Sequence, residues 1–378
     1  MQPILRFPEF KNKWSYDLFS NIVTNKSKKF NPETEDPIKD IELDSIEQNT
    51  GRLLITYISD QFTSQKNKFS KDNVLYSKLR PYLNKYYYSQ IDGVCSSEIW
   101  VLNTLNKKIL SNKFLYYFIQ TNRFSSVANK SAGSKMPRAD WELVKNIRLY
   151  KGSIEEQERI GNFFSKLDRQ IELEEEKLEL LEQQKRGYMQ QIFSQDLRFK
   201  DENGDDYTAW KETTIKEIAE IKTGSKDTKD AREDGNYNFY VRSPIIHKIN
   251  SYSYNGEAIL TVGDGVGVGK VFHYVNGKFD YHQRVYKISD FKNYYGLLLY
   301  YYFSKNFLKE ARKYNAKTSV DSVRKDMIAN MKVPMPIMEE QQKIGMFLKK
   351  LESKIDYQNS KINLLKQRKR GFLQKMFV

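Results

Sequence analysis

The side chains that most often carry out bond chemistry are scarce in this chain. Cys95 is the only cysteine, which provides neither a disulfide framework nor a thiolate metal cluster. The histidines have no cysteine or carboxylate at the spacing of a zinc site. Two of them, His273 and His282, lie in a strand-rich stretch, where we expect surface or turn positions. The sequence therefore predicts no metal site.

The glycine-rich stretch GDGVGVGK at 263–270 has the composition of a phosphate-binding loop without its pattern. Asp264 and Val271 break the G-x-x-x-x-G-K-[ST] spacing, and G-x-G-x-x-G is absent too. We predict a tight turn between strands, with close approach of the backbone to a ligand as a second possibility. Because no G-x-S-x-G motif or carboxylate pair stands out either, we predict that the chain is not an enzyme.

Basic residues are the remaining chemical signal. The chain of 378 residues has 63 Lys and Arg against 48 Asp and Glu, for a net charge of +15. Residues 1–153 carry +9 of this and residues 194–337 carry +4. Such a balance favours polyanionic partners, although it says nothing about the fold.

Basic and amide side chains occur in loops of both segments. Such side chains can read base edges in the major groove, although most basic residues only hold phosphates. For any single residue a solvated surface charge is the simpler interpretation, so the prediction of DNA binding depends on the repetition in two segments. The candidates are Lys78, Arg80, Lys85, Lys130, Lys135 and Arg138, then Lys226, Arg242, Lys270, Gln283, Arg284 and Lys317.

A duplicated segment must position these loops. Residues 154–193 and 338–377 match without a gap at a constant offset of 184, and 18 of the 40 positions are identical. Each copy follows a variable segment, so the order is variable, repeat, variable, repeat. Such a duplication indicates a molecule that is two-fold in plan.

Both copies have the apolar spacing of a coiled coil. Apolar residues alternate at intervals of four and three, which keeps one narrow stripe facing a partner helix. Polar residues occupy two slots of each stripe, Glu174 and Lys185 in the first copy and Gln358 and Lys369 in the second. We predict that the copies pair antiparallel; the alternative is that each docks on its own domain. The helix-pairing residues are Ile160, Phe164, Leu167, Ile171, Leu178, Leu181, Ile344, Leu348, Leu351, Ile355, Ile362 and Leu365.

The variable segments resemble each other in plan. Each contains a strand-rich stretch broken by Gly, Pro or Asn-Gly turns, followed by an aromatic, helix-like run at Phe114–Ile119 or Leu297–Phe303. We therefore predict an α/β fold with two similar mixed α/β domains separated by two long helices packed as an antiparallel coiled coil, with pseudo-two-fold symmetry. The predicted domains are residues 1–153, 154–193, 194–337 and 338–378.

Several motifs together resemble the specificity subunit of type I restriction–modification systems. The repeat opens with E-E-Q-x-(R/K)-I-G and ends with K-R-G-(Y/F), and the lead-ins are WELVKNIRL (141–149) and KVPMPIMEEQ (332–341). RFPEFKNKW and RFKDENGDDYTAW (198–210) resemble the openings of the family's two target-recognition domains. One departure is LYKGSIEEQ (149–157), which replaces a proline-rich turn and leaves the geometry of that junction open.

This resemblance implies a division of labour. Each variable domain would read one half of a bipartite, asymmetric sequence in double-stranded DNA, and the helices would set the spacer between the halves. Two methyltransferase subunits would bind the chain and methylate adenine with S-adenosylmethionine. Two restriction subunits would add translocation and cleavage driven by ATP with magnesium. These cofactors would lie on the partner chains and none on this one.

Two other interpretations compete with DNA recognition. The chain could be a coiled-coil adaptor with incidental basic domains, which predicts no sequence-selective DNA binding. It could instead be a nuclease or methyltransferase itself, which predicts activity of the chain alone and lacks motif support. Neither a signal-peptide core nor a run of 18 apolar residues is present, so we expect a cytoplasmic protein without a membrane partner.

Overall fold

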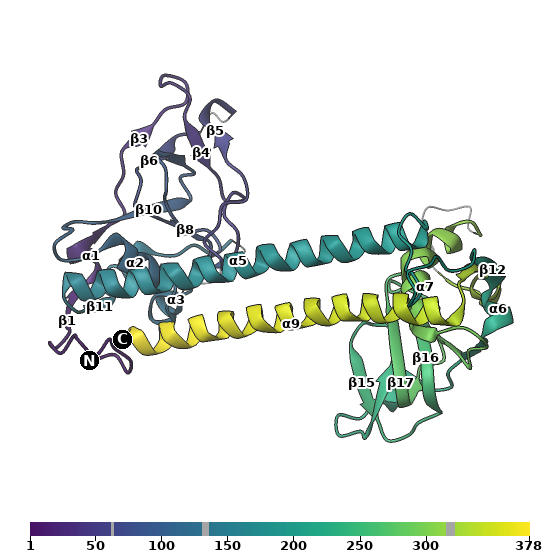
Figure 1. The fold of residues 1–378 in the computed structure, drawn as a ribbon. Helices are drawn as coiled ribbons and strands as arrows, with labels where there is room; N and C mark the ends of the chain where they lie inside the picture. The colour runs from purple at the N-terminus through teal and green to yellow at the C-terminus, as the bar shows by residue number, and fades with distance from the viewer. Residues whose placement is uncertain (62–63, 131–135, 315–321) are drawn as a thin grey trace. The chain divides into compact units, whose positions relative to one another are not determined.

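A computed structural model of the chain describes residues 1–61, 64–130, 136–314 and 322–378. These residues form two compact units. Unit 1 comprises Met1–Glu176 with Ser360–Val378, and unit 2 comprises Lys177–Asn359. Two long helices contribute to both: α5 (Ile154–Phe193) begins in unit 1, and α9 (Met338–Met376) begins in unit 2 (Figure 1).

Unit 1 contains two larger sheets. One has the strand order β2-β10-β7-β8 and the other β3-β6-β9-β4-β5, while β1 pairs with β11. The strands are β1 Ser15–Leu18, β2 Val23–Thr24, β3 Lys29–Phe30, β4 Lys39–Ile41, β5 Tyr57–Ile58, β6 Lys66–Phe69, β7 Val74–Ser77, β8 Tyr86–Tyr88, β9 Gly93–Cys95, β10 Ile99–Thr104 and β11 Arg148–Lys151. The helices are α1 Phe19–Ile22, η1 Ser59–Gln61, η2 Pro81–Leu83, α2 Asn112–Phe118, α3 Asn122–Ala128 and α4 Trp141–Val144.

Unit 2 contains one larger sheet, of order β13-β18-β16-β17-β14-β15, and the pair β12-β19. Its strands are β12 Lys211–Thr214, β13 Glu220–Thr223, β14 Tyr237–Tyr240, β15 Ile246–Ile249, β16 Tyr254–Val262, β17 Phe272–Tyr281, β18 Val285–Ser289 and β19 Lys332–Met335. Its helices are α6 Ile215–Ile218, η3 Thr228–Asp230, α7 Gly296–Arg312 and α8 Lys325–Ala329.

The two units share a half-sheet and differ beyond it. The order β2-β10-β7-β8 in unit 1 corresponds to β13-β18-β16-β17 in unit 2, because β10 and β18 each precede the aromatic helix, α2 or α7. Beyond that half-sheet, unit 1 adds a separate five-stranded sheet, whereas unit 2 extends the same sheet with β14 and β15. The prediction of two similar α/β domains is confirmed.

The aromatic helices organise the larger core of each unit. In α2, Phe114, Leu115 and Phe118 are buried against the half-sheet, together with Ile160 and Phe164 of α5. In unit 2, α7 buries Leu298, Phe303 and Phe307 with Ile344 and Leu348 of α9 among others. Burial of large aromatic and aliphatic side chains is the main stabilising contribution in both cores.

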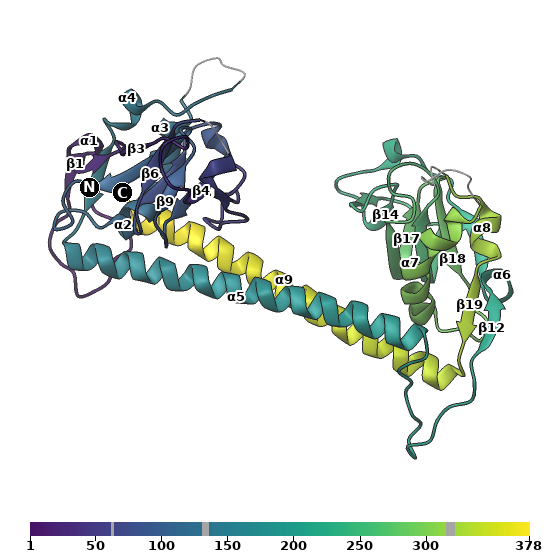
Figure 2. The same ribbon diagram turned by 90° about the horizontal axis from the view of Figure 1, so that it is seen from above.

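The long helices pair antiparallel within each unit. In unit 1, Phe163 of α5 meets Phe372 of α9 edge-on, with ring centroids 5.2 Å apart. In unit 2 the equivalent pair is Tyr188 of α5 and Phe347 of α9, with centroids 5.1 Å apart. Figure 2 shows the first half of α5 beside the last half of α9 in unit 1. The predicted antiparallel pairing is therefore confirmed.

The predicted helix-pairing residues are all buried or half-buried. Four of them are half-buried, and the rest are buried. The half-buried ones are Leu167, Leu178, Leu181 and Ile355; the buried ones are Ile160, Phe164, Ile171, Ile344, Leu348, Leu351, Ile362 and Leu365. The alternative of docking on a domain is partly right as well, because the ends of both helices enter the domain cores.

The lysine in a polar slot of each long helix has an equivalent partner in the other copy. Lys369 of α9 pairs with Asp168 of α5 at 2.7 Å, and the Tyr117 hydroxyl also donates to Asp168. In unit 2, Lys185 pairs with Glu352 at 3.0 Å, and the Tyr301 hydroxyl donates to Glu352. All these positions correspond at the offset of 184, so the lysine of each copy forms an equivalent salt bridge that helps to fix register.

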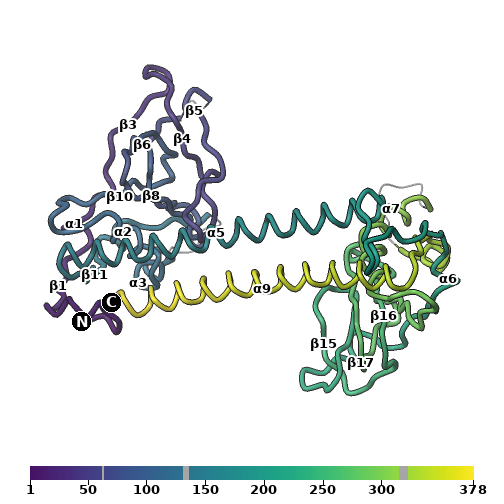
Figure 3. The backbone as a smooth tube through the Cα atoms, in the orientation of Figure 1, coloured from purple at the N-terminus to yellow at the C-terminus, as the bar shows by residue number. Residues whose placement is uncertain are grey.

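A buried glutamate joins each long helix to the opening of its unit. Glu156 is buried, accepts two hydrogen bonds from the Arg6 guanidinium at 2.9 and 2.8 Å, and accepts one from Trp14 Nε1 at 2.9 Å. Figure 3 shows that both chain ends lie in unit 1, where Leu5 N donates to Lys375 O. This set of three residues, Arg6, Trp14 and Glu156, is called the clamp of unit 1.

Unit 2 has the same clamp. Glu340 is fully buried, pairs with Arg198 at 2.8 Å, and accepts a hydrogen bond of 2.8 Å from Trp210 Nε1. The contact of Arg and Trp with the buried Glu therefore explains why both unit openings share R-F and W and why the E-E-Q motif is repeated. A buried carboxylate requires such partners because an unpaired buried charge is costly.

The departure at Gly152 leaves the junction before α5 unchanged in its hydrogen bonding. Gln157 Nε2 donates to the Gly152 carbonyl at 3.0 Å, and Gln341 Nε2 donates to the equivalent Pro336 carbonyl at 2.8 Å. A Cβ at position 152 would lie 1.9 Å from the Glu156 carboxylate. A side chain at position 152 would therefore displace the Glu156 carboxylate from its position in the clamp.

One expectation about histidine is wrong. His282 is buried at 3% exposure, because it forms a β-bridge with Lys226 and its Nδ1 accepts a hydrogen bond from Arg284 N at 2.9 Å. The glycine-rich stretch 263–270 does connect two strands, β16 and β17, as predicted. Among the described residues, no helix is long and apolar enough to span a membrane.

Candidate nucleic-acid interface

Three segments of unit 1 meet where β7 ends. Lys78 N donates to Glu98 O at 3.0 Å, and Ala139 N donates to Lys78 O at 2.7 Å. Leu79 forms a β-bridge with Arg138. These bonds bring together the end of β7, the start of β10 and the segment before α4. We call residues 78–80, 98 and 137–139 the loop junction of unit 1.

Unit 2 forms the same backbone arrangement where β16 ends. Gly263 N donates to Arg284 O at 2.7 Å, and Val323 N donates to Gly263 O at 2.7 Å. Asp264 forms a β-bridge with Ser322. Residues 263–264, 284 and 322–323, together with Arg242, whose side chain contacts Asp264, are the loop junction of unit 2, and position 284 takes the place of Glu98.

The side chains of the unit 1 junction are basic around one carboxylate. Arg138 donates to Glu98 through Nε and Nη2, both at 3.0 Å, and Lys78 Nζ lies 3.9 Å from the same group. The hydrogen bond from Arg138 lowers the pKa of Glu98, so the carboxylate is ionised at neutral pH. Arg80 is exposed and has a positive φ of 50°, held by a hydrogen bond from its N to Pro137 O at 2.7 Å.

The unit 2 junction places two arginines on one carboxylate. Arg242 Nη1 lies 3.3 Å from Asp264 Oδ1, and Arg284 Nε lies 3.6 Å from Asp264 Oδ2. Both arginine side chains remain more than half exposed, at 52% and 65%. Burial and the Arg242 charge lower the pKa of neighbouring His282, so the imidazole is neutral at pH 7.

A second polar contact lies beside this junction. Gln283 Nε2 donates to Asp227 Oδ2 at 3.2 Å, and Gln283 N donates to Lys226 O at 2.8 Å. Four of the six predicted residues of unit 2 thus share one end of its sheet. Lys270 is exposed in the 263–271 loop that begins at Gly263.

The remaining candidates differ in their surroundings. Lys85 is half-buried, and its Nζ donates to Leu43 O at 2.6 Å, which commits one donor of the ammonium to the protein. Lys130 is exposed just after α3. Lys135 and Lys317 lie outside the described residues. The structure therefore gathers Lys78, Arg80 and Arg138 in unit 1, and Lys226, Arg242, Gln283 and Arg284 in unit 2.

The sequence did not reveal the two carboxylates, Glu98 and Asp264. Both are partly exposed acidic residues among basic neighbours, and acidic residues are common on any surface. Glu98 lies 40 positions from its arginine partner, so neither periodicity nor spacing links them. The only sequence signal was Asp264 in the glycine-rich stretch, where it counted only as a break in a motif.

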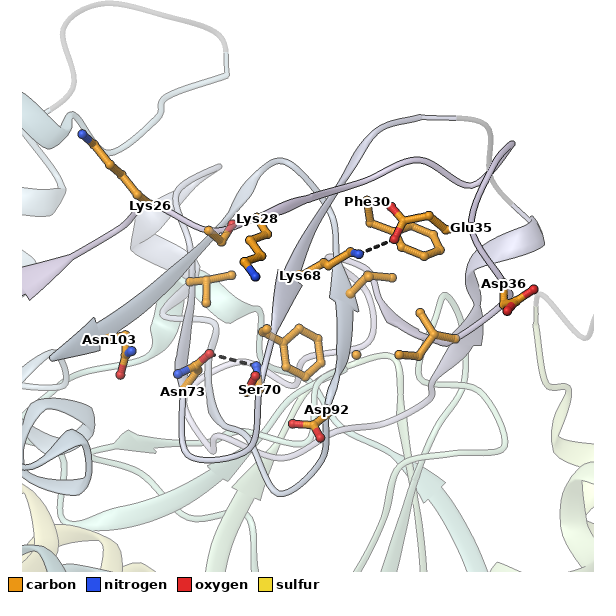
Figure 4. Close-up of a pocket in the computed structure, with 16 residues that line it drawn as sticks. Lys26, Lys28, Phe30, Glu35, Asp36, Lys68, Ser70, Asn73, Asp92 and Asn103 are labelled. Carbon is orange, nitrogen blue, oxygen red and sulfur yellow. Dashed lines mark hydrogen bonds and ion pairs between the residues drawn. The ribbon is translucent and has the colours of Figure 1, made fainter. Parts of the chain in front are cut away.

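A groove of about 580 Å³ lies elsewhere in unit 1. Figure 4 shows side chains of both signs along it, with Lys68 paired to Glu35 and Asn73 accepting from Ser70 N. None of the described residues that line it is histidine or cysteine. In addition, no group of three or more potential metal ligands occurs within residues 1–61, 64–130, 136–314 and 322–378. These features do not form a recognisable catalytic set.

A family model described as "Type I restriction modification DNA specificity domain" matches residues 16–183 and 207–367. The type I restriction enzyme EcoDI specificity subunit of Escherichia coli is 28% identical over 156 residues, or 40% of this chain and 34% of that protein. The MjaVIII specificity subunit of Methanocaldococcus jannaschii is 23% identical over 334 residues, 74% of this chain and 72% of that one.

Solved structures share the fold. The type I restriction–modification S subunit from M. genitalium matches with a TM-score of 0.65 at 16% identity, covering 100% of this chain and 99% of that chain. A structure from work on complex assembly and conformational transition of the type I R-M system matches with a TM-score of 0.58 at 17% identity, covering 97% and 98%. At these identities the likeness concerns the fold alone.

Proposed function

Because the chain belongs to the family of type I restriction–modification DNA specificity domains, we propose that it is the DNA-recognition subunit of such an enzyme. In this proposal each unit reads one half of a bipartite, asymmetric sequence. The observation that carries the assignment is the pair of loop junctions, built by the same backbone hydrogen bonds and equipped with different side chains. A common frame with distinct contact groups is what two separate half-sites require.

The junction chemistry suits the major groove. Arginine presents a planar fork that can donate to both O6 and N7 of guanine, and glutamine can pair with adenine in a similar way. Lysines nearby are suited to phosphates, which supply affinity that falls with salt. Arg242 and Arg284 are exposed enough to reach such partners, and so is Arg138.

The reactions of the system belong to partner chains in this proposal. Two methyltransferase subunits use S-adenosylmethionine to methylate adenine, and two restriction subunits use ATP and magnesium to move and cut DNA. This chain is non-catalytic and positions them, while the paired helices α5 and α9 set the spacer between half-sites. The system then distinguishes the host's methylated DNA from foreign DNA in the cytoplasm.

A duplicated feature of the helices supports two equivalent partner sites. Gly187 of α5 and Gly371 of α9 occupy equivalent positions, and a Cβ at either would meet nothing within 4 Å. Glycine inside a helix costs about 1 kcal/mol relative to alanine, so its presence twice has no explanation within the described chain. Close approach of a partner backbone explains it, with exposed Arg186 and Arg370 beside each site.

Larger side chains at these glycines test the partner sites. G187L and G371L should leave the isolated chain at least as stable as the wild type, because helix propensity improves and space is open. Each should remove one methyltransferase subunit from the complex, and the double variant should remove both, as measured by native mass spectrometry. The matched control is E179L on an exposed part of α5; unchanged assembly in the glycine variants would contradict the proposal.

Exchange of one recognition segment tests the function itself. Residues 1–153 are replaced by the corresponding segment of another specificity subunit, and genomic methylation is then sequenced in a host that carries the methyltransferase subunit. One half of the methylated sequence should change and the other half should stay. A change in both halves would exclude two separate readers. Binding without any sequence preference would instead favour the adaptor interpretation.

A further inference from the structure

Glu98 and Asp264 are acidic groups in the junctions that the proposed function places against DNA. A carboxylate there repels phosphate, so its presence needs a cause other than affinity. Folding does not provide one, because ion pairs this exposed contribute little to stability. Glu98 and Arg138 are 26% and 49% exposed, and Asp264 and Arg242 are 28% and 52% exposed. Each carboxylate nevertheless binds basic side chains of its own junction.

The geometry at Glu98 leaves the arginine able to read a base. A guanidinium has five N–H groups, and Arg138 directs two of them, on Nε and Nη2, at Glu98. Three donors remain, which exceeds the two needed for the O6 and N7 atoms of guanine. The ion pair therefore fixes the plane of the fork without using up its reading edge, and less side-chain freedom is lost on binding.

The equivalent junction of unit 2 achieves the same arrangement from another backbone position. Position 284 replaces Glu98 and carries an arginine, while the carboxylate moves to Asp264, which corresponds to Leu79. Asp264 then lies within 3.3 Å of Arg242 and 3.6 Å of Arg284. Both junctions therefore contain one carboxylate with two basic side chains, although the carboxylate is attached at different backbone positions.

We propose that Glu98 and Asp264 are positioning residues for sequence reading. Glu98 holds Arg138, and Asp264 holds Arg242 and Arg284, in the orientation that discriminates bases of one half-site. This proposal rests on the proposed function, since it requires that the junctions face DNA. It goes further in assigning specificity to acidic residues that make no favourable contact with the DNA backbone. It also assigns each carboxylate to a different half of the target.

The experiment uses the complex of the full chain with its methyltransferase subunits. Its target is first read from methylated genomic DNA. Dissociation constants are then measured at fixed salt for the target duplex and for duplexes with one base pair changed in either half. E98Q should lower the discrimination ratio about fivefold at one or two positions of one half-site, and D264N should do so only in the other half.

Matched controls separate positioning from charge. Glu35 pairs with Lys68 and Glu220 pairs with Lys222, both away from the junctions. E35Q and E220Q remove the same charge and should raise affinity for all duplexes alike, with unchanged ratios. Thermal unfolding midpoints of E98Q and D264N should match the wild type, so that a loss of discrimination cannot arise from misfolding.

A double-mutant cycle tests whether Glu98 acts through Arg138. R138A should reduce discrimination about tenfold or more at the positions affected by E98Q, and the double variant should be no worse than R138A alone. Independent, multiplying losses would overturn the positioning role. Equal losses in both half-sites, or unchanged ratios in E98Q and D264N, would overturn the proposal as well. A wild-type complex without any sequence preference would instead refute the proposed function.

Discussion

The two units use one frame and differ in what they attach to it. The clamp, the slot lysines and the aromatic pair between α5 and α9 occur in both, at positions related by the offset of 184 or at matching places in the two openings. The sheets diverge beyond the shared half-sheet, and so do the junction side chains. Buried charge and helix register were therefore kept between the units, whereas the exposed loop chemistry was free to change.

Removing the buried glutamate of either clamp should give the largest loss of unfolding free energy, and the loss should be equal in the two units. E156A leaves the Arg6 charge and the buried Trp14 N–H without their acceptor, so we expect unit 1 to lose about 3–5 kcal/mol of unfolding free energy. E340A should cost unit 2 a similar amount. Hydrogen exchange resolved by peptide reports each unit separately. The control E155A changes an exposed neighbour and should have little effect; a large asymmetry between the clamps would break the comparison.

Alanine in place of the glycine near the start of each long helix should destabilise unit 2 more than unit 1. A methyl group at Gly345 would lie 2.7 Å from the Tyr295 ring, so G345A should cost about 1–3 kcal/mol. At Gly161 the methyl would meet the flexible Lys113 side chain at 2.9 Å. G161A should therefore be near neutral, because helix propensity offsets a small displacement. Chemical denaturation of both variants checks this order, and a costlier G161A would contradict it.

Acid should lower the stability of unit 2, by less than the substitutions above, and should leave the stability of unit 1 unchanged. All three histidines lie in unit 2, and burial lowers the pKa of both His273 and His282 below 6.5. A base with a lowered folded pKa binds its proton more readily when unfolded, so this contribution to stability is lost as pH falls below about 6.5. Exchange rates corrected for intrinsic pH dependence should rise in unit 2 between about pH 7 and 5.5. H273Q should reduce the change.

The sequence was sufficient for the frame because its signals are periodic. The alternating intervals at Ile160, Phe164 and Leu167 predicted the helices, and the offset of 184 predicted their equivalence. The slot residues Lys185 and Lys369 stood out as exceptions to that period. Their partners could not be read from the sequence, because they lie on the other helix at long sequence separation.

The candidate site was only partly predictable. Basic loop residues such as Arg138 and Arg284 were found by type, but their grouping depends on strand order, which residue types alone do not determine. Lys85 illustrates the limit: its charge resembled that of Lys78, yet it donates to a backbone carbonyl inside the unit. The clamp was within reach, since R-F and a following W recur in both unit openings and E-E-Q occurs in both copies of the repeat, but a shared motif does not reveal its contact.

The division of the chain between the units has a consequence for synthesis on the ribosome. Nascent proteins generally fold from the N-terminus onward, one domain after another. Unit 2 is a single continuous stretch, whereas unit 1 includes Ser360–Val378, which is translated after all of unit 2. The lobe that is made first must therefore wait until all of the other lobe has been translated. A premature stop near position 360 would spare the later-made lobe and leave the earlier one incomplete.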